Sequence, residues 1–137
     1  MTLKELLNTN DRFAAMSGVQ LTEVKEGYVK AQMTVTTNHL NAGGVCQGGA
    51  LFTLGDLAFA ALMNCHGKLT FGIGNSISFL HSAKEGDELT AEAIEVFNHH
   101  KIPSCEVKIT NQEGCLICTM TGTAYRKDIE MKFDGLM

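Results

Sequence analysis

The chain has 137 residues, 45% of them hydrophobic and 19% charged, which is typical of one globular domain over residues 1–137 and leaves little room for a second. Lysine and arginine number 11 against 15 acidic residues, giving a net charge of −4, and no basic run interleaves with aromatic residues. We therefore expect no nucleic-acid partner. The N-terminus lacks a signal-peptide layout, and no apolar stretch reaches the roughly 18 to 20 residues needed to span a bilayer. We expect a cytoplasmic protein with no membrane partner.

The first 18 residues are predicted to form a helical flap. Leu3–Met16 has a helical pattern, Asn10 or Asp11 is a candidate cap for a second turn, and Gly18 ends it. Tyr28–Thr36 follows with the strict alternation of a half-buried strand.

The second half of the chain is a run of strands without regular helical crossovers. In Leu89–Phe97, Ile94 and Val96 fall on the opposite parity from Leu89, which predicts either a bulge or a strand covered on both faces. The other predicted strands cover 73–79, 105–110 and 115–125, and a hairpin loop is predicted at 111–114. An antiparallel sheet of five to six strands with helices packed on one face, an α+β fold, is the class this order favours.

Five cysteines are spread over the whole chain, an odd number unlike a disulfide framework, so we expect reduced thiols. Cys115 and Cys118 form a CxxC pair, which invites a metal or redox interpretation. They lie in a strand-like segment whose positions three apart face opposite sides, and no second pair completes a zinc site. Buried apolar side chains are the favoured interpretation, with no metal.

The most informative stretch is glycine-rich and leads into a helix that is apolar around its whole circumference, from Ala50 to Cys65. Such a helix should be buried on nearly all sides, by the sheet and by something else. It carries a single acid, Asp56, which in apolar surroundings needs a partner or a function. Either Asp56 lies at an exposed point or bonds to Thr53 or Asn64, or it is a general base or nucleophile with a perturbed proton affinity.

The start of this helix is Gln47-Gly48-Gly49 in place of a usual capping residue. Backbone amides left without an acceptor at a positive helix end can hold an oxyanion or polarise a carbonyl, which makes Gly48 and Gly49 candidate donors. The alternative is that the glycines only make a tight turn. Gly48 and Asp56 lie roughly 12 Å apart along the helix axis, too far for both to touch one reacting carbon. An antiparallel second copy would bring its Asp56 to this Gly48, which predicts an obligate dimer with two composite sites.

These residues resemble a known family. Asn41, Gln47-Gly48-Gly49, Phe52 and Asp56 are similar to the signature of the hotdog-fold acyl-CoA thioesterases of the phenylacetate-degradation type, and the likeness extends through 76–80, 86–87 and 121–124. The resemblance implies an antiparallel sheet wrapped around one long central helix, paired into a homodimer and often a dimer of dimers. It implies no metal or organic cofactor.

The resemblance also implies the roles of the site residues. The Gly48 amide would polarise the thioester carbonyl, the partner subunit's Asp56 would activate water or attack directly, and Asn41 would orient the water or the carbonyl. Gln47 and Gly49 would bind substrate. The implied reaction is hydrolysis of a small or medium acyl-CoA, possibly an aryl one, in a pocket lined partly by Phe13 and Met16 of the flap.

Two departures from the family are visible. Relatives usually carry histidine where this chain has Gln47, which cannot titrate near neutrality. Where some relatives carry a serine or threonine on the third strand, this chain has Gly72, with Thr70 the nearest hydroxyl. Lys84, Arg126 and Lys127 are available for the CoA nucleotide, and the turn residues His39, His66 and 99–101 are expected to be solvated.

Two alternatives remain open. The first is a module that binds acyl-CoA without turnover, an alternative that Gln47 in place of histidine favours. A hotdog dehydratase or hydratase is disfavoured because it needs a proline-containing loop with histidine ahead of the helix, whereas the only proline, Pro103, lies far downstream.

Overall fold

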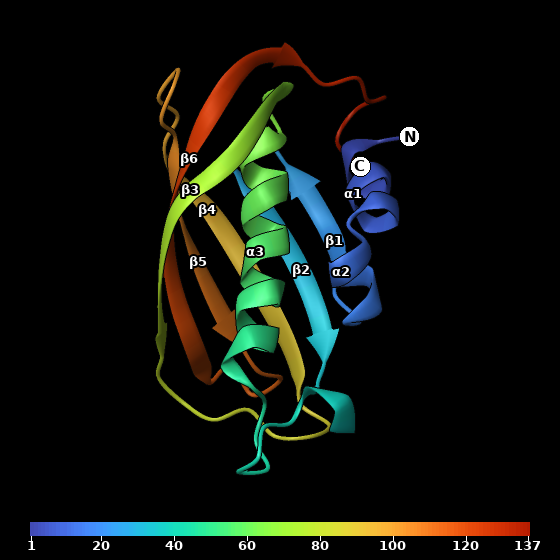
Figure 1. The fold of residues 1–137 in the computed structure, drawn as a ribbon, viewed down its shortest axis with the longest axis vertical. Coiled ribbons are helices and arrows are strands. Elements are labelled where there is room, and N and C mark those ends of the chain that lie inside the picture. Colours follow the sequence, from blue (N-terminus) through green and yellow to red (C-terminus); the bar gives the residue numbers. More distant parts are fainter.

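The computed structural model describes residues 1–137, and its main elements are a sheet and one long helix lying across it (Figure 1). All six strands belong to one antiparallel sheet, in the order β1-β2-β4-β5-β6-β3. The α+β class predicted from the strand pattern is therefore confirmed. In chain order the elements are α1 (Leu3–Asn10), α2 (Arg12–Met16), β1 (Gln20–Lys25), β2 (Tyr28–Thr34), the short 3-10 turn η1 (Thr37–His39), α3 (Gly48–Asn64), β3 (Lys68–Phe79), β4 (Glu88–Phe97), β5 (Ser104–Thr110) and β6 (Leu116–Glu130).

The core lies between α3 and the face of the sheet that curves around it. Alternate residues of the strands point at the helix, and their side chains are almost fully buried. The Phe59 ring fills the space beside Gly122, where a Cβ atom would collide with the ring. Examples of the inward residues are Val29, Ala31 and Met33 of β2 and Cys105, Val107 and Ile109 of β5.

One stripe of α3 stays uncovered within the single chain. Gly49 and Asp56 are exposed there, and Thr53 and Ala60 are only partly buried. These positions recur every three to four residues, so they share the face turned away from the sheet. Most of the rest of the helix is buried, as predicted from its apolar circumference, but no second layer covers this stripe in one chain.

The N-terminal flap is two short helices, as the position of Asp11 predicted. Asp11 caps α2, since its side chain accepts a hydrogen bond from the Ala14 amide at 3.1 Å. α1 is held by the end of the chain, where the Leu3 amide donates to the Gly135 carbonyl at 2.9 Å. In Figure 1 both helices lie along β1 and the chain termini lie close together.

Three strands differ in part from what the sequence pattern suggests. β1 is not evident from the sequence pattern because a register irregularity between Leu21 and Glu23 breaks its alternation. In β4 the bulge exists, between Glu95 and Phe97, and the covered-on-both-faces alternative is wrong for this chain because Ile94 and Val96 are more than half exposed. The predicted strand at 73–79 extends back to Lys68 and lies at an edge of the sheet, exposed along most of its length.

The five cysteines are free, and all but Cys115 are buried. Burial raises the pKa of Cys105 to about 12 and those of Cys46 and Cys118 to about 11, which makes these thiols poor nucleophiles. None of the helices combines the length and the apolarity that crossing a bilayer requires.

Candidate active site

The first turn of α3 presents backbone donors without acceptors. Gln47 is the N-cap residue in an extended conformation, and its side chain makes no capping hydrogen bond. The Gln47 carbonyl accepts from the amides of Ala50 and Leu51, whereas the amides of Gly48 and Gly49 have no acceptor in the chain. The positive end of a 17-residue helix is therefore open to an anion or a polarised carbonyl oxygen, as the sequence predicted.

Gly48 opens into a cavity of about 420 Å³ on the side of α3 that faces the end of β3. The Phe79 ring packs so closely on Gly48 that a Cβ atom there would lie 2.9 Å from its ζ carbon. Asn41 lines the same cavity, so two of the predicted catalytic residues come together. The sequence does not single out Phe79, because its contact with Gly48 joins segments about thirty residues apart.

The side chain of Asn41 has one polar group without a hydrogen-bond partner in the chain. Its Oδ1 accepts hydrogen bonds from the amides of Gly43 and Val45, at 2.9 and 3.2 Å, and so shapes the turn before α3. Its Nδ2 makes no hydrogen bond within the chain. Asn41 can therefore act on a substrate only as a donor through Nδ2, which fits orientation of a carbonyl or water oxygen.

A second cavity of about 510 Å³ lies on the other side of the same helical turn. It is lined by Gln47 and Gly49 together with Phe13 and Ser17 of the flap segment. Of the two flap residues expected to line a pocket, Phe13 does so, whereas Met16 is 75% exposed and is not part of the lining. The first turn of α3 thus separates two hollows, one beside Gly48 and one beside Gly49.

Asp56 lies in neither cavity. It is on the open stripe of α3, two turns beyond the glycines, and the chain places no hydrogen-bond donor on its carboxylate. Thr53 bonds instead to the Gly49 carbonyl, and Asn64 to the Ala60 and Thr70 carbonyls, so the structural role considered for Asp56 through either residue is wrong.

The pKa of Asp56 is raised above its usual value. The side chain is exposed in the single chain, yet the protein around the helix partly desolvates the carboxylate, which raises its pKa. The negative charge of Asp11 on the flap raises the pKa further. A carboxylate that holds its proton more tightly is also a stronger base once ionised, which suits general-base chemistry.

Replacing Asp11 by asparagine is expected to move the acidic limb of the kcat/KM profile to lower pH. Removing the neighbouring negative charge lowers the pKa of Asp56, and activity that needs ionised Asp56 then persists to lower pH. Asparagine keeps the helix cap. The measurement is a pH–rate profile beside that of Glu113→Gln, a charge change in the distant hairpin loop. An unmoved limb in Asp11→Asn contradicts the coupling.

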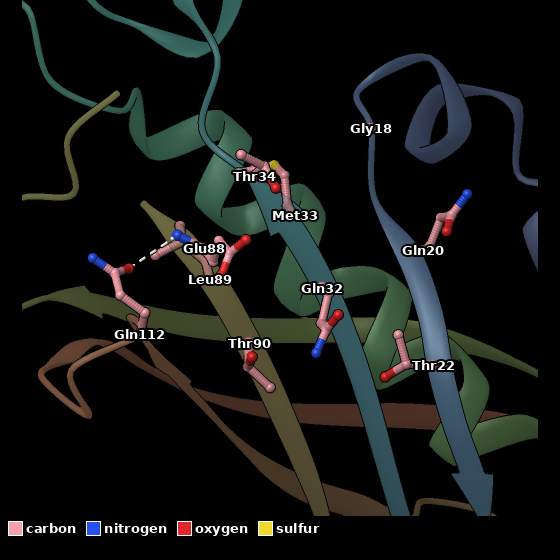
Figure 2. Close-up of a pocket in the computed structure, with 10 residues that line it drawn as sticks. All are labelled: Gly18, Gln20, Thr22, Gln32, Met33, Thr34, Glu88, Leu89, Thr90 and Gln112. Carbon is pink, nitrogen blue, oxygen red and sulfur yellow. Dashed lines mark hydrogen bonds between the residues drawn. The ribbon is translucent and has the colours of Figure 1, made fainter. Parts of the chain in front are cut away.

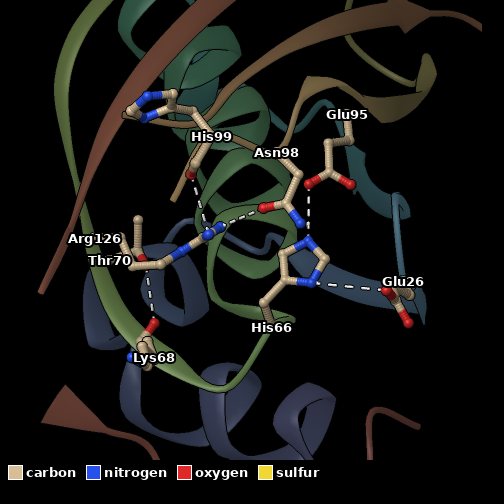
Figure 3. Close-up of polar contacts among 8 residues, drawn as sticks. All are labelled: Glu26, His66, Lys68, Thr70, Glu95, Asn98, His99 and Arg126. Atoms are coloured by element: carbon tan, nitrogen blue, oxygen red, sulfur yellow. Dashed lines mark hydrogen bonds and ion pairs between the residues drawn. The ribbon is translucent and has the colours of Figure 1, made fainter. Parts of the chain in front are cut away.

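A separate polar cluster surrounds the other end of α3 (Figure 3). His66 contacts Glu95 at 2.8 Å, and both side chains are mostly buried, so the expectation that His66 is a solvated turn residue is wrong. Arg126 is buried and donates to the His99 carbonyl and to Asn98. The Thr70 hydroxyl donates to the Lys68 carbonyl, lines neither cavity and gives no support for a catalytic role. This cluster ties strands and turns together and contains none of the residues expected at the reacting thioester.

The sheet face turned away from α3 carries a further hollow of about 330 Å³ (Figure 2). Its lining is mostly neutral and polar, from threonine and glutamine side chains of β1, β2 and β4 with Glu88. It lies across the sheet from the glycine turn, so it is not part of the predicted site.

Comparison with known proteins gives a consistent family. Residues 43–118 match the family model of the thioesterase superfamily. A curated protein of Archaeoglobus fulgidus is 41% identical over 124 residues, 90% of this chain and 80% of that protein. The acyl-coenzyme A thioesterase PaaI of Escherichia coli is 32% identical over 117 residues, 85% of this chain and 84% of that protein.

Solved structures agree. The E. coli PaaI protein from the phenylacetic acid degradation operon superposes with a TM-score of 0.90 at 30% identity, covering 93% of each chain. A thioesterase of Streptococcus pneumoniae, solved with coenzyme A, gives a TM-score of 0.83 at 28% identity, covering 90% of this chain and 99% of that one. The predicted family and fold are both confirmed: the chain belongs to the thioesterase superfamily and is a PaaI-like enzyme with the hotdog fold.

Proposed function

We propose that this thioesterase hydrolyses a small or medium acyl-CoA, an aryl-substituted one included, to the free acid and CoA. The observation that carries the proposal is the pair of free amides at the start of α3, on residues that line two cavities and on the helix that also bears Asp56. Support for the CoA part comes from PaaI of E. coli, which is named an acyl-coenzyme A thioesterase, and from the streptococcal relative solved with coenzyme A.

The active unit is proposed to be a dimer joined along β3. This strand is one of the two edges of the sheet, the one away from the flap (Figure 1), and exposes large apolar side chains, among them Phe71, Ile73 and Phe79. An exposed apolar edge is a template for pairing with another strand. Antiparallel pairing of two β3 strands about a two-fold axis would join the sheets and bring the two α3 helices side by side. Two such dimers can then associate into a tetramer.

In this dimer each site takes groups from both copies. The Gly48 amide of one protomer would hold the thioester oxygen, with the Asn41 Nδ2 as a second donor. The partner subunit's Asp56 would take a proton from water as the water adds to the carbonyl carbon, or would itself attack to form an anhydride that water then opens. In both routes the carbon–sulfur bond breaks, and the thiolate leaves and takes up a proton. Gln47 binds substrate by hydrogen bonding but supplies no proton.

The test is a panel of acyl-CoAs of different chain length, straight and aryl, assayed by release of free thiol. Hydrolysis of at least one member at a rate far above the buffer blank is expected. Binding of acyl-CoA by calorimetry with no thiol release from any member would instead favour a module that binds without turnover, the alternative that Gln47 in place of histidine raises.

The phosphates of CoA are proposed to lie in a basic hollow of about 280 Å³. In an antiparallel β3 pair, the Lys68 end of one strand lies beside the Phe79 end of the other, so this hollow would lie near the partner subunit's glycine turn. Lys84 does not line this hollow; it lies in the turn before β4, where its amide donates to Asp87. The lining residues of the hollow are Lys68, His100, Lys101, Arg126, Lys127 and Asp128.

Replacing Lys101 and Lys127 together by alanine is expected to raise KM for acyl-CoA about tenfold, with a smaller salt dependence, because two cations near the phosphates are lost. KM for an N-acetylcysteamine thioester, which lacks the nucleotide, should stay as in the parent. Lys84→Ala is the matched control. An equal rise in KM for both thioesters would place the effect outside phosphate binding.

A further inference from the structure

The cavity beside Gly49 is built from two parts of the chain that the sequence separates widely. α3 and the turn before it supply Gln47, Gly49 and Phe52, and the flap supplies Phe13, which is 62% exposed. The proposed function requires the thioester carbonyl to be held at the free amides. One hollow can then bind the CoA side of the substrate, and the other can bind its acyl group. Four of the ten residues that line the flap cavity are hydrophobic, and two of these are phenylalanines, whose rings can pack against an acyl group.

The flap is held beside this cavity by few interactions. α2 has five residues, and only Ala14 among them is buried. Its backbone bonds run within residues 7–19. The only hydrogen bond that joins residues 12–18 to a more distant segment is the one from His39 Nε2 to the Ser17 carbonyl, at 2.7 Å. The position of Phe13 over the cavity therefore depends strongly on His39.

His39 connects three segments at once. Its Nδ1 accepts the Thr36 amide at 2.9 Å, and its Nε2 bonds to the Ser17 carbonyl. Because an amide can only donate and a carbonyl only accept, the ring is neutral with its proton on Nε2. The His39 carbonyl accepts the Gln47 amide at 2.8 Å, directly before the free amides of α3. One residue thus ties the flap, the exit of β2 and the start of the helix to one another.

We propose that His39 is the positioning residue that fixes the α2 flap over the acyl side of the site, and that Phe13, held in this way, selects the acyl group. The sequence suggests only a solvated turn histidine, because its partner Ser17 lies 22 residues away. The identification of this cavity as the acyl site rests on the proposed function. The hydrogen bonds by which His39 joins the flap to the helix do not depend on it.

Two amide variants separate the two ring nitrogens. The glutamine side chain in His39→Gln places its amide nitrogen near the position of Nε2 and can still donate to Ser17. The shorter side chain in His39→Asn reaches only the position of Nδ1, so it keeps the Thr36 bond and loses the flap bond. We expect His39→Asn to lower the ratio of kcat/KM for phenylacetyl-CoA over acetyl-CoA about tenfold, mainly through KM, and His39→Gln to restore most of that ratio.

A second measurement does not depend on activity. Amide hydrogen exchange in residues 12–18 should speed up about tenfold in His39→Asn and stay near the parent rate in His39→Gln, with melting temperatures recorded for both. If His39→Asn does not fold, Phe13→Ala, a change at an exposed side chain, must reduce the same acyl ratio.

The outcomes are distinct. If the parent is active and both His39 variants keep its acyl preference and its flap exchange rate, this inference alone is overturned. An equal change in both variants overturns it as well. A parent that hydrolyses no acyl-CoA overturns the proposed function and the selection of acyl groups, while faster flap exchange confined to His39→Asn still supports the tie.

Discussion

Replacing Asp56 by asparagine is expected to lower kcat/KM for acyl-CoA by about a thousandfold or more. Asparagine has nearly the same shape but neither takes a proton from water nor attacks a carbonyl, so the proposed base or nucleophile is lost while the amides of Gly48 and Gly49 remain. The measurement is thiol release at saturating and limiting substrate. Glu113 is an exposed acidic residue in the hairpin loop. The Glu113→Gln variant is the control, and its kcat/KM should match that of the parent.

The same substitution is expected to leave the melting temperature unchanged or higher at neutral pH. Because the pKa of Asp56 is raised in the folded chain, the fold favours its protonated form. The stabilisation linked to this proton is present at low pH and is lost as the pH rises through the raised pKa, so ionised Asp56 opposes folding at neutral pH. Asparagine removes that opposition. Its advantage over the parent should therefore shrink as the pH falls below the pKa of Asp56. A thousandfold loss of activity together with a lower melting temperature would point to unfolding rather than to lost chemistry.

Elements with a simple pattern were predicted well from the sequence. β2 and β5 alternate strictly because one face packs on α3, and Asp11 begins α2 because its side chain caps a free amide. The free amides before Ala50 were predicted for the same local reason, since a glycine pair without a capping side chain leaves donors unpaired.

Features set by distant contacts were not predicted. The sequence suggests solvated turn residues at His39 and His66, but their partners Ser17 and Glu95 lie 22 and 29 residues away, and no local pattern reports such a contact. β3 is apolar like an inner strand, yet it lies at the edge of the sheet. Composition is the same for a strand buried within one chain and for a strand buried against a second copy.

The amide of Gly48 can be deleted without removing the helix. Gly48 is the first residue of α3, where proline is favourable, and Gln47 before it already has the extended conformation that proline requires. Gly48→Pro should lower kcat about a hundredfold or more by removing one donor to the developing oxyanion. Gly48→Ala adds the same Cβ atom against the Phe79 ring but keeps the N–H, so it controls for crowding. Equal losses in the two variants would assign the effect to Phe79 and not to the amide.

Mixing the two inactive chains tests whether the site is shared between subunits. In a dimer of one Gly48→Pro chain and one Asp56→Asn chain, one site combines the intact Gly48 amide with the partner subunit's intact Asp56, and the other site lacks both. Random exchange of subunits makes half of the dimers mixed, so about a quarter of the parent activity should return. The measurement is thiol release after joint refolding, compared with each variant refolded alone. A site within one chain could regain nothing from such mixing, so unchanged inactivity in a mixture shown to contain mixed dimers would contradict a site shared between subunits.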